Sequence, residues 1–237
     1  MANFFLPENY QENPASSFDI DTNKNYWNPK RVKTSISYQW AAYQWANKVI
    51  KRQKIHRVAD VGCGFACKLN ELYRNNPNVE FWGIDQPNAI ALCKKHYRFG
   101  NWLEINLEQD PVHPPKKFGL VISSDVIEHL GNPDILIKYL KLLVADDGYI
   151  LVTTPERDIL RGLGSLSSPN RAHAREWNTN EFTSYLKSHD LHIVEKKMLA
   201  AQKFIFERNY LKTLLRRSIM LRSMRYNQAY LLKVVEK

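Results

Sequence analysis

The sequence contains few of the features that mark secreted or membrane-embedded proteins. Its 237 residues include three cysteines, Cys63, Cys67 and Cys93, which are too few for a disulfide framework. No run of about 18 apolar residues is present to form a bilayer-spanning helix, and the first residues lack the basic start and long apolar stretch of a secretory signal. With 44% hydrophobic and 24% charged residues, the composition is that of an ordinary globular protein. We therefore expect a cytoplasmic protein with one full-sized core.

Positive charge is concentrated near the end of the chain. The net charge is +10, and residues 198–237 carry nine basic and two acidic side chains, a net +7. We predict a basic helical insertion at about 203–225, with Glu207 to Leu221 as its amphipathic segment. Such a segment can make a peripheral membrane contact or face a phosphate-bearing ligand, although a solvated helix face is the commonest explanation. Proteins that track nucleic acid interleave basic and aromatic residues over a broad face, so this confinement argues against a nucleic-acid partner.

Between residues 56 and 154 the sequence alternates strand-like apolar runs with helix-like segments. Alternation of this kind indicates a parallel sheet covered by helices. The predicted strands are 57–61, 79–84, 102–106, 119–123 and 149–154, and the predicted helices are 66–75, 87–97 and 133–144. Further along, Asn178 and Glu181 form a capping-box pattern that opens another helix. A sixth strand from Leu191 and a last strand over 227–235 follow.

The first 55 residues carry ten aromatic side chains ahead of the first predicted strand. Thr34 to Arg52 contains no glycine or proline and is predicted as a helix that Thr34 or Ser35 caps. So many aromatic side chains require burial. We expect residues 1–55 to form a helical lid over a ligand bound by residues 56–237. The alternative is that Trp40 and Tyr43 pack on the sheet as ordinary core.

An apolar strand that ends in two glycines predicts a nucleotide site. Residues Val58 to Gly64 read Val-Ala-Asp-Val-Gly-Cys-Gly, and Asp85 closes the next apolar run. A strand that turns through Gly-x-Gly brings its backbone against a ligand without an intervening Cβ, and the following helix offers unpaired N–H groups. Dinucleotide-binding units place an acidic residue for the ribose hydroxyls about 20 residues downstream. The dehydrogenase pattern, however, requires a third glycine where this chain has Cys67.

Asp60, two positions before Gly62, completes an Asp-x-Gly-x-Gly pattern that resembles class I methyltransferases using S-adenosylmethionine (SAM). Two later segments resemble the same family: Phe118 to Leu130, which ends Glu-His-Leu, and Asp147 to Pro155, which ends Thr-Thr-Pro. The resemblance covers residues 56–196, with the motifs in family order. It implies an α/β fold, with a doubly wound Rossmann-like sheet of seven strands, the last strand antiparallel, and helices on both faces.

The resemblance also implies how SAM is held, with S-adenosylhomocysteine (SAH) as the product. The first acidic residue and the two glycines would line the methionine end. The acidic residue after the second strand would bind the ribose hydroxyls, and its neighbour would lie against the adenine. Asn106 stands where the family usually has an acidic residue near the adenine amino group, and its amide oxygen can accept the same hydrogen bond. Ser123 would contact the methionine portion or the acceptor. The implied cofactor-binding residues are Asp60, Gly62, Gly64, Asp85, Gln86, Asn106, Leu107 and Ser123.

Two histidines are candidates for a catalytic base. A hydroxyl acceptor must lose its proton as the carbon–oxygen bond forms, and histidine titrates near neutrality. His129 is the first candidate, although it could instead orient a loop, and Glu128 is predicted as structural or as a substrate hydrogen-bond acceptor. His173 lies in a His-Ala-Arg-Glu-Trp segment, and similar segments in glycan-associated members imply that His173 and Arg175 face the active site. The alternative for Arg175 and Glu176 is a surface ion pair.

These motifs predict a SAM-dependent O-methyltransferase for a small hydroxylated molecule. The Arg-Glu-Trp segment favours a saccharide or its nucleotide-linked form over a quinone precursor or secondary metabolite. The alternatives are an RNA methyltransferase and a catalytically inactive fold that serves as an interaction module. The chain lacks the Asn/Asp-Pro-Pro-Tyr motif of base N-methylating relatives, and its intact glycine motif argues against an inactive fold. No cluster of carboxylates and histidines shows metal-ligand spacing, so no ion is predicted. The oligomeric state is not predicted.

Overall fold

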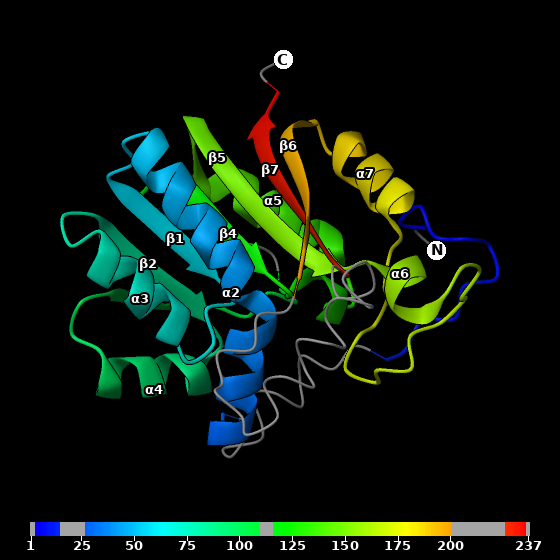
Figure 1. Cartoon of the computed structure of the whole chain (residues 1–237), viewed down its shortest axis with the longest axis horizontal. Coiled ribbons are helices and arrows are strands. Elements are labelled where there is room, and N and C mark those ends of the chain that lie inside the picture. Colours follow the sequence, from blue (N-terminus) through cyan, green and yellow to red (C-terminus); the bar gives the residue numbers. More distant parts are fainter. Residues whose placement is uncertain (1–2, 15–26, 110–115, 201–225, 236–237) are drawn as a thin grey trace, which may run out of the picture.

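A seven-stranded β-sheet forms the centre of the computed structural model, which describes residues 3–14, 27–109, 116–200 and 226–235. The strands are β1 (Arg57–Val61), β2 (Glu80–Asp85), β3 (Asn101–Glu104), β4 (Phe118–Ser124), β5 (Val144–Pro155), β6 (Leu191–Leu199) and β7 (Asn227–Val234). Their order across the sheet is β3-β2-β1-β4-β5-β7-β6 (Figure 1). Strands β1 to β5 pair in parallel, and β7 is antiparallel to both β5 and β6. The predicted doubly wound sheet with an antiparallel last strand is confirmed.

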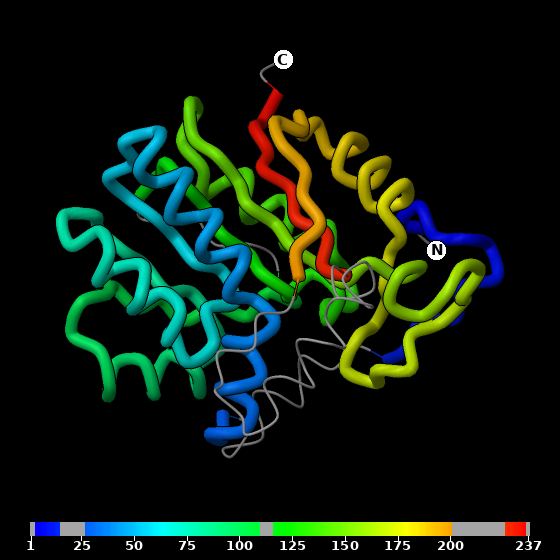
Figure 2. The backbone as a smooth tube through the Cα atoms, viewed as in Figure 1, coloured from blue at the N-terminus to red at the C-terminus, as the bar shows by residue number. Residues whose placement is uncertain are grey.

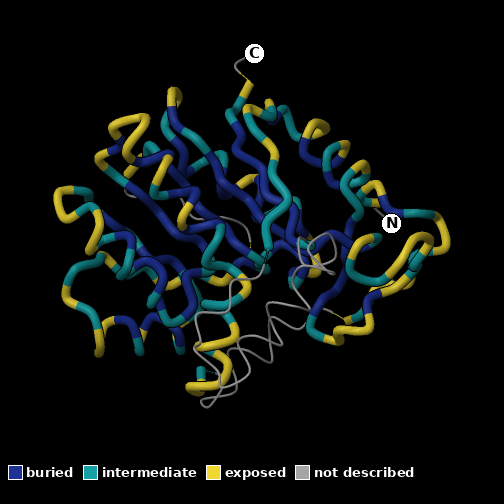
Figure 3. The backbone as a smooth tube through the Cα atoms, viewed as in Figure 1, coloured by how far each residue is buried: buried dark blue, intermediate teal, exposed yellow. Residues whose placement is uncertain are grey.

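Helices cover both faces of this sheet. The helices are α2 (Pro29–Arg52), α3 (Cys67–Asn75), α4 (Pro87–His96), α5 (Pro133–Leu143), α6 (Arg157–Arg161) and α7 (Thr179–Ser188), with a 3-10 turn η1 (Ile127–His129). Helices α2, α3 and α4 share one hydrophobic cluster with the sheet, and α5 and α7 share the other. In Figure 1, α2 and α3 lie in front of the sheet and α5 behind it. Because both faces are covered, the central strands are buried along almost their whole length (Figure 3).

The boundaries of most elements agree with the sequence pattern. The predicted capping box opens α7, because the Asn178 side chain accepts hydrogen bonds from the N–H groups of Asn180 and Glu181. Strand β5 begins earlier than predicted, at Val144, which pairs with Phe118 directly after α5 ends. A β-bulge then separates this pair from the rest of the β4–β5 ladder.

Helix α2 also begins earlier than predicted, at Pro29 instead of Thr34. Neither Thr34 nor Ser35 is its cap. Asn28 caps the helix, and its side chain accepts a hydrogen bond of 3.0 Å from the Arg31 N–H. Asn followed by Pro is a strong start signal, since the side chain caps the first turn and proline loses no helical hydrogen bond there. The signal was present in the sequence and outweighs the threonine and serine that follow it.

The two halves of α2 have different surroundings. Between Ala42 and Ile50 its inward face is buried with α3 and the sheet, and Tyr43 is 1% exposed. Tyr43 therefore packs in the core, as the alternative interpretation predicted. Residues at the beginning of the helix, together with Trp27, instead line a cavity at one edge of the sheet.

Residues 3–14 lie far from α2, beside the loop that precedes α7 (Figure 2). Gln11 forms a β-bridge with Ser167, and the Trp177 indole N–H donates to the Phe4 carbonyl at 2.9 Å. The segment that was expected to act as one lid thus contributes to two separate parts of the molecule.

The predicted basic insertion at about 203–225, including Glu207 to Leu221, lies outside the described residues. Within the described ranges, no helix combines the length and the apolar character needed to cross a membrane.

Candidate active site

A cavity of about 780 Å³ opens at the carboxyl ends of the parallel strands. The sheet order reverses between β1 and β4, and open α/β sheets bind ligands at such a point. The cavity wall comes from the beginning of α2, the glycine turn after β1, the end of β2, the turn after β4, and the loop before α7. Its volume is within the range of small-molecule sites.

The glycine turn after β1 has a backbone that only glycine accommodates easily. Gly62 and Gly64 have φ values of +79° and +57°. A Cβ on Gly62 would lie 2.3 Å from a methyl group of Val126, and one on Gly64 would lie 2.4 Å from the ring of Trp27. Both positions therefore require glycine for conformation and for space, and the turn leaves backbone exposed to the cavity. This geometry fits a ligand that the backbone approaches closely.

Asp85 lies at the end of β2, next to the glycine turn. One carboxylate oxygen accepts the Gly64 N–H at 2.7 Å, and the other accepts the N–H of Gln86 at 2.7 Å. Each carboxylate oxygen can accept a further hydrogen bond, so Asp85 can still bind ligand hydroxyls. Gln86 occupies the N-cap position of α4 without a side-chain capping hydrogen bond, and both Asp85 and Gln86 line the cavity as predicted.

Asp60 lies beneath this turn and is fully buried. One of its carboxylate oxygens accepts a hydrogen bond of 2.8 Å from the Tyr43 hydroxyl. Burial raises the pKa of Asp60 to about 7, although the positive charge of Lys68 and the Tyr43 hydrogen bond oppose the rise. The other carboxylate oxygen has no hydrogen-bond partner among the described residues. A buried carboxylate oxygen without a partner is consistent with a nearby ligand that carries a positive charge or a hydrogen-bond donor.

Three predicted cofactor residues do not line the cavity: Asp60, Asn106 and Ser123. Asn106 is exposed, and its amide oxygen accepts the Glu108 N–H at 3.0 Å in a local turn. Leu107 and Glu108 line the cavity at this position. Ser123 is buried within β4, and Asp125, two residues beyond it, reaches the wall instead.

Asp125 has a left-handed backbone with φ +54°. Its carboxylate accepts hydrogen bonds from the Thr153 hydroxyl at 2.6 Å and the Asn227 amide at 2.8 Å. A non-glycine residue in this conformation stores strain, and such strain concentrates at functional sites. Burial raises the pKa of Asp125.

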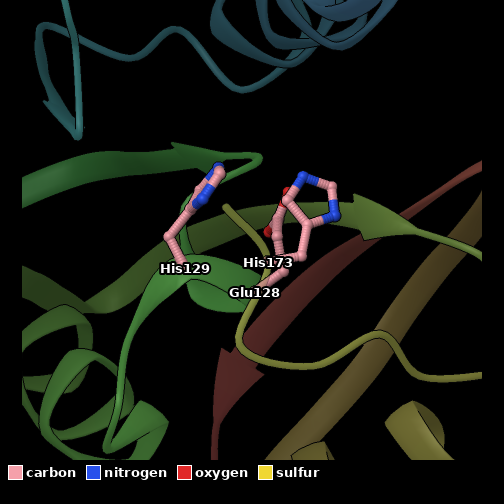
Figure 4. Close-up of side chains that lie close together, drawn as sticks. All are labelled: Glu128, His129 and His173. Atoms are coloured by element: carbon pink, nitrogen blue, oxygen red, sulfur yellow. The ribbon is translucent and has the colours of Figure 1, made fainter. Parts of the chain in front are cut away.

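The three predicted catalytic residues meet at one side of the cavity. Glu128 and His129 come from η1, and His173 comes from the loop before α7 (Figure 4). One side-chain nitrogen or oxygen of each residue lies within 4.8 Å of the others. The two imidazole rings are perpendicular, with centroids 4.8 Å apart.

His129 is held in one tautomer. Its Nδ1 lies 2.6 Å from the Ala172 carbonyl oxygen, which only accepts, so Nδ1 carries the hydrogen and Nε2 keeps its lone pair. Burial and then the charge of His173 lower the pKa of His129 to about 4. The ring is therefore neutral at neutral pH.

His173 is held by a buried carboxylate. Its Nδ1 lies 2.6 Å from Glu176, which also binds the Arg161 guanidinium through two hydrogen bonds and the Ser168 hydroxyl through one. Burial alone would raise the pKa of Glu176, but the hydrogen bonds from Arg161 and His173 lower it to about 2. The carboxylate is ionised and accepts the hydrogen of Nδ1, so His173 also offers Nε2 as an acceptor.

Glu128 is the third member of this cluster and is fully buried. The Thr154 hydroxyl donates to its carboxyl group at 3.1 Å. Burial and then the neighbouring Asp125 raise the pKa of Glu128 well above its ordinary value, which favours the protonated acid.

Glu128, His129 and His173 also offer atoms that could hold a metal ion. Sequence spacing gave no sign of this, because His173 reaches the site from a distant loop. Bonds of about 2 Å to one ion would place the ligand atoms about 3 to 3.5 Å apart, so the side chains would have to draw together. As they stand, they are better arranged to contact an acceptor hydroxyl.

The expectation that Arg175 faces the active site is wrong. Its guanidinium is 1% exposed and binds Glu12 and the carbonyl oxygens of Leu130 and Gly131. Nor do Arg175 and Glu176 form a surface ion pair, since both are buried and Arg175 pairs with Glu12 while Glu176 pairs with Arg161. Arg161 is the arginine that both pairs with Glu176 and lines the cavity.

Lys68, Asp125 and Arg161 are among the wall residues that sequence reasoning missed. Lys68 gave a usable signal, because it follows the glycine turn at a helix position where burial is expected. Asp125 lies within the Phe118 to Leu130 segment that was recognised, three residues before Glu128. Arg161 belongs to the short α6, which no sequence pattern predicted.

Comparison with known proteins agrees with this geometry. A ubiquinone biosynthesis O-methyltransferase of Dictyostelium discoideum is 26% identical over 59% of this chain and 48% of its own length. A probable S-adenosylmethionine-dependent methyltransferase of Mycobacterium tuberculosis is 26% identical over 71% of this chain and 56% of its own length. The chain thus spans about half the length of these curated relatives.

A solved structure of the plantazolicin methyltransferase BpumL in complex with SAH has the same fold. It superimposes with a TM-score of 0.60 at 20% identity, covering 93% of this chain and 94% of that protein. A sequence model of the methyltransferase domain family matches residues 22–196. The chain therefore belongs to the methyltransferase domain family, and these comparisons support SAM, the predicted cofactor, as its ligand.

Proposed function

We propose that the chain transfers the methyl group of SAM to a hydroxyl group of a small molecule. The observation that carries this proposal is the pair of His173 and Glu176. An imidazole anchored by a buried, ionised carboxylate at 2.6 Å lines the same cavity as the glycine turn and Asp85. Such a site can hold the donor and remove the acceptor proton.

His173 is a better base than His129, which was the first candidate from sequence. With a pKa of about 4, His129 binds a proton too weakly to be efficient at neutral pH. Glu176 instead places a negative charge beside His173 and stabilises the imidazolium that forms when Nε2 accepts a proton. The two rings lie 4.8 Å apart, and a charge on His173 lowers the pKa of His129.

When bound, SAM would supply an activated methyl group on a sulfonium, and its sulfur would leave with the bonding electrons as the acceptor oxygen bonds to the methyl carbon. The chain mainly orients the acceptor and excludes water. His173 takes the hydroxyl proton, His129 offers a neutral acceptor, and the protonated Glu128 can donate a hydrogen bond to the acceptor. Proton removal of this kind typically contributes about 10²- to 10⁴-fold to the rate.

The acceptor is best sought among quinone precursors. The Dictyostelium relative is named as an enzyme of ubiquinone biosynthesis. The saccharide preference came from the Arg-Glu-Trp segment, and in this chain the arginine of that segment is buried against Glu12, away from the cavity. The reason for preferring a sugar is therefore lost.

The test uses the purified chain with methyl-labelled SAM and a panel of lipidic quinone precursors, other phenols, sugars, nucleotide sugars and structured RNA. We expect label on a phenolic hydroxyl. Label on none of the small molecules would refute the proposal, and label on RNA would favour the alternative suggested by the basic segment. Failure of SAH to bind in calorimetry would favour an inactive interaction module.

The role of His173 is tested with His173→Gln and the matched variant His129→Gln. We expect His173→Gln to lower kcat by about 10²- to 10⁴-fold and His129→Gln to lower it by less than about 10-fold. A phenol acidic enough to be ionised at the assay pH needs no base, so it should recover most of the rate in His173→Gln. Equal loss with the ionised phenol would contradict a role in proton removal.

A further inference from the structure

Lys68 is a buried cation at the wall of the cavity. It lies in the first turn of α3 and is 4% exposed. Its ammonium donates to the Ser35 hydroxyl at 2.8 Å and lies 5.4 Å from the centroid of the Tyr43 ring. In the described part of the chain, no carboxylate forms an ion pair with it. Buried lysines are rare unless they are paired, so this charge requires an explanation.

Asp60 does not provide a full counter-charge. The charge of Lys68 lowers the pKa of Asp60, but burial outweighs it and keeps that pKa near 7. The carboxylate is also directed to the Tyr43 hydroxyl. At neutral pH Asp60 is therefore only partly ionised, and although the nearby Asp125 also attracts this charge, neither carboxylate forms an ion pair with the ammonium group beside the cavity.

The geometry of α3 directs this charge toward the glycine turn. Side chains in the first turn of a helix tilt toward its N-terminus, and Lys68 follows Gly64 by four residues. Lys68, Gly62 and Gly64 all line the same cavity. An anionic group of a ligand that contacts the turn would therefore meet the ammonium group.

We infer that Lys68 binds the carboxylate of the methionyl part of SAM. This inference rests on the proposed function and assigns a residue that binds one group of the donor. The methionyl carboxylate is the only anionic group of SAM, and a lysine–carboxylate contact is a charge-assisted hydrogen bond. Lys68 binds this carboxylate but does not touch the transferred methyl group.

The lysine is held in place before the donor arrives. Ser35, which accepts from Lys68, donates to Gln39 at 2.9 Å, and the Gln39 amide donates to the Ser124 carbonyl at 3.1 Å. This chain of hydrogen bonds joins α3, α2 and the end of β4. A pre-positioned cation binds its ligand with little loss of side-chain entropy.

The test compares three ligands by calorimetry: SAM, decarboxylated SAM and 5′-methylthioadenosine, which lacks the amino-acid portion. The variants are Lys68→Met, Lys68→Arg and Lys95→Met, the last at an exposed lysine of α4. The wild type should bind SAM about 10- to 100-fold more tightly than decarboxylated SAM. Lys68→Met should lose this preference and bind 5′-methylthioadenosine as the wild type does. Lys68→Arg should retain part of the preference, and Lys95→Met all of it.

Two results would overturn the inference. In the first, the wild type binds SAM and decarboxylated SAM equally, and measuring this result requires no variant. Lys68→Met could weaken all three ligands by the same factor, which would make Lys68 a structural residue of the wall. If the wild type bound none of the three ligands, the proposed function itself would fail, and this outcome differs from both.

Discussion

Replacing Tyr43 with phenylalanine would remove one buried hydroxyl that holds the cofactor end of β1. The hydroxyl donates to Asp60 at 2.8 Å, and both residues are buried. The phenyl ring would stay packed in the core between α2 and the sheet. A hydrogen bond to a charged group contributes about 1.5–3 kcal/mol, and one between neutral groups about 1 kcal/mol. We therefore expect Tyr43→Phe to cost more stability when Asp60 is ionised.

The pH dependence of this cost follows from the pKa of Asp60. Burial raises that pKa from 3.8 to about 7, so between these values the folded chain binds a proton that the unfolded chain has released. The stabilisation that comes from this bound proton is complete below pH 3.8 and is lost as the pH rises through about 7. Without the Tyr43 hydroxyl the pKa of Asp60 rises further, and the loss extends to higher pH. The cost of Tyr43→Phe should grow from about 1 kcal/mol near pH 5 to about 2–3 kcal/mol near pH 8.5.

Urea unfolding of the wild type and Tyr43→Phe at both pH values measures this difference. Tyr139→Phe is the matched control, because Tyr139 is also buried but its hydroxyl has no hydrogen-bond partner among the described residues. We expect this control to be neutral or stabilising at both pH values. The reasoning is refuted if Tyr43→Phe costs the same at both, or if Tyr139→Phe is equally destabilising.

Three further outcomes follow from the site. Gly64→Ala should weaken SAH binding by at least about 10-fold, because its Cβ would lie 2.4 Å from Trp27; Gly164→Ala, with φ +76° and nothing within 4 Å, should keep the affinity. The pKa of His129 falls from 6.5 to about 4 on folding, so stability should decline by about 1–3 kcal/mol as pH drops through this window, and His129→Gln should flatten the decline in urea unfolding. Amide exchange along α2 should be equally slow with and without SAH; faster exchange in the free chain would show an opening helix.

The fold could be predicted because its signals are local. Strand β1 and the glycine turn are adjacent in sequence, and the caps at Asn132 and Asn178 each depend on a few neighbouring residues. The starts of α2 and β5 were each predicted five residues late, and at α2 a local signal at Asn28 was present but unused. Local patterns decide where helices begin, and alternation of strands and helices then leaves few topologies.

The site could be predicted only in part, because its chemistry depends on contacts between distant segments. Asp85 and the glycines follow from spacing, since the parallel strands bring their ends to one edge. His173 could be named as a candidate, but its advantage over His129 depends on Glu176 being buried and ionised. Which arginine faces the cavity could not be predicted, because Arg175 binds Glu12 and two carbonyl oxygens away from the cavity, whereas His173 in the same loop lines it.

Helix α2 connects the cofactor site to the core through one row of side chains. Ser35, Gln39 and Tyr43 are four residues apart, so they share a face of the helix, and each makes a polar contact with the glycine-turn region or the end of β4. The buried Ala46 and Ile50 continue nearly the same face over the sheet. To swing away, α2 would have to break three hydrogen bonds, roughly 2–4 kcal/mol in total, and expose its apolar half. Helix α2 is therefore a fixed wall of the site, and the residues at its beginning line the cavity from that fixed position.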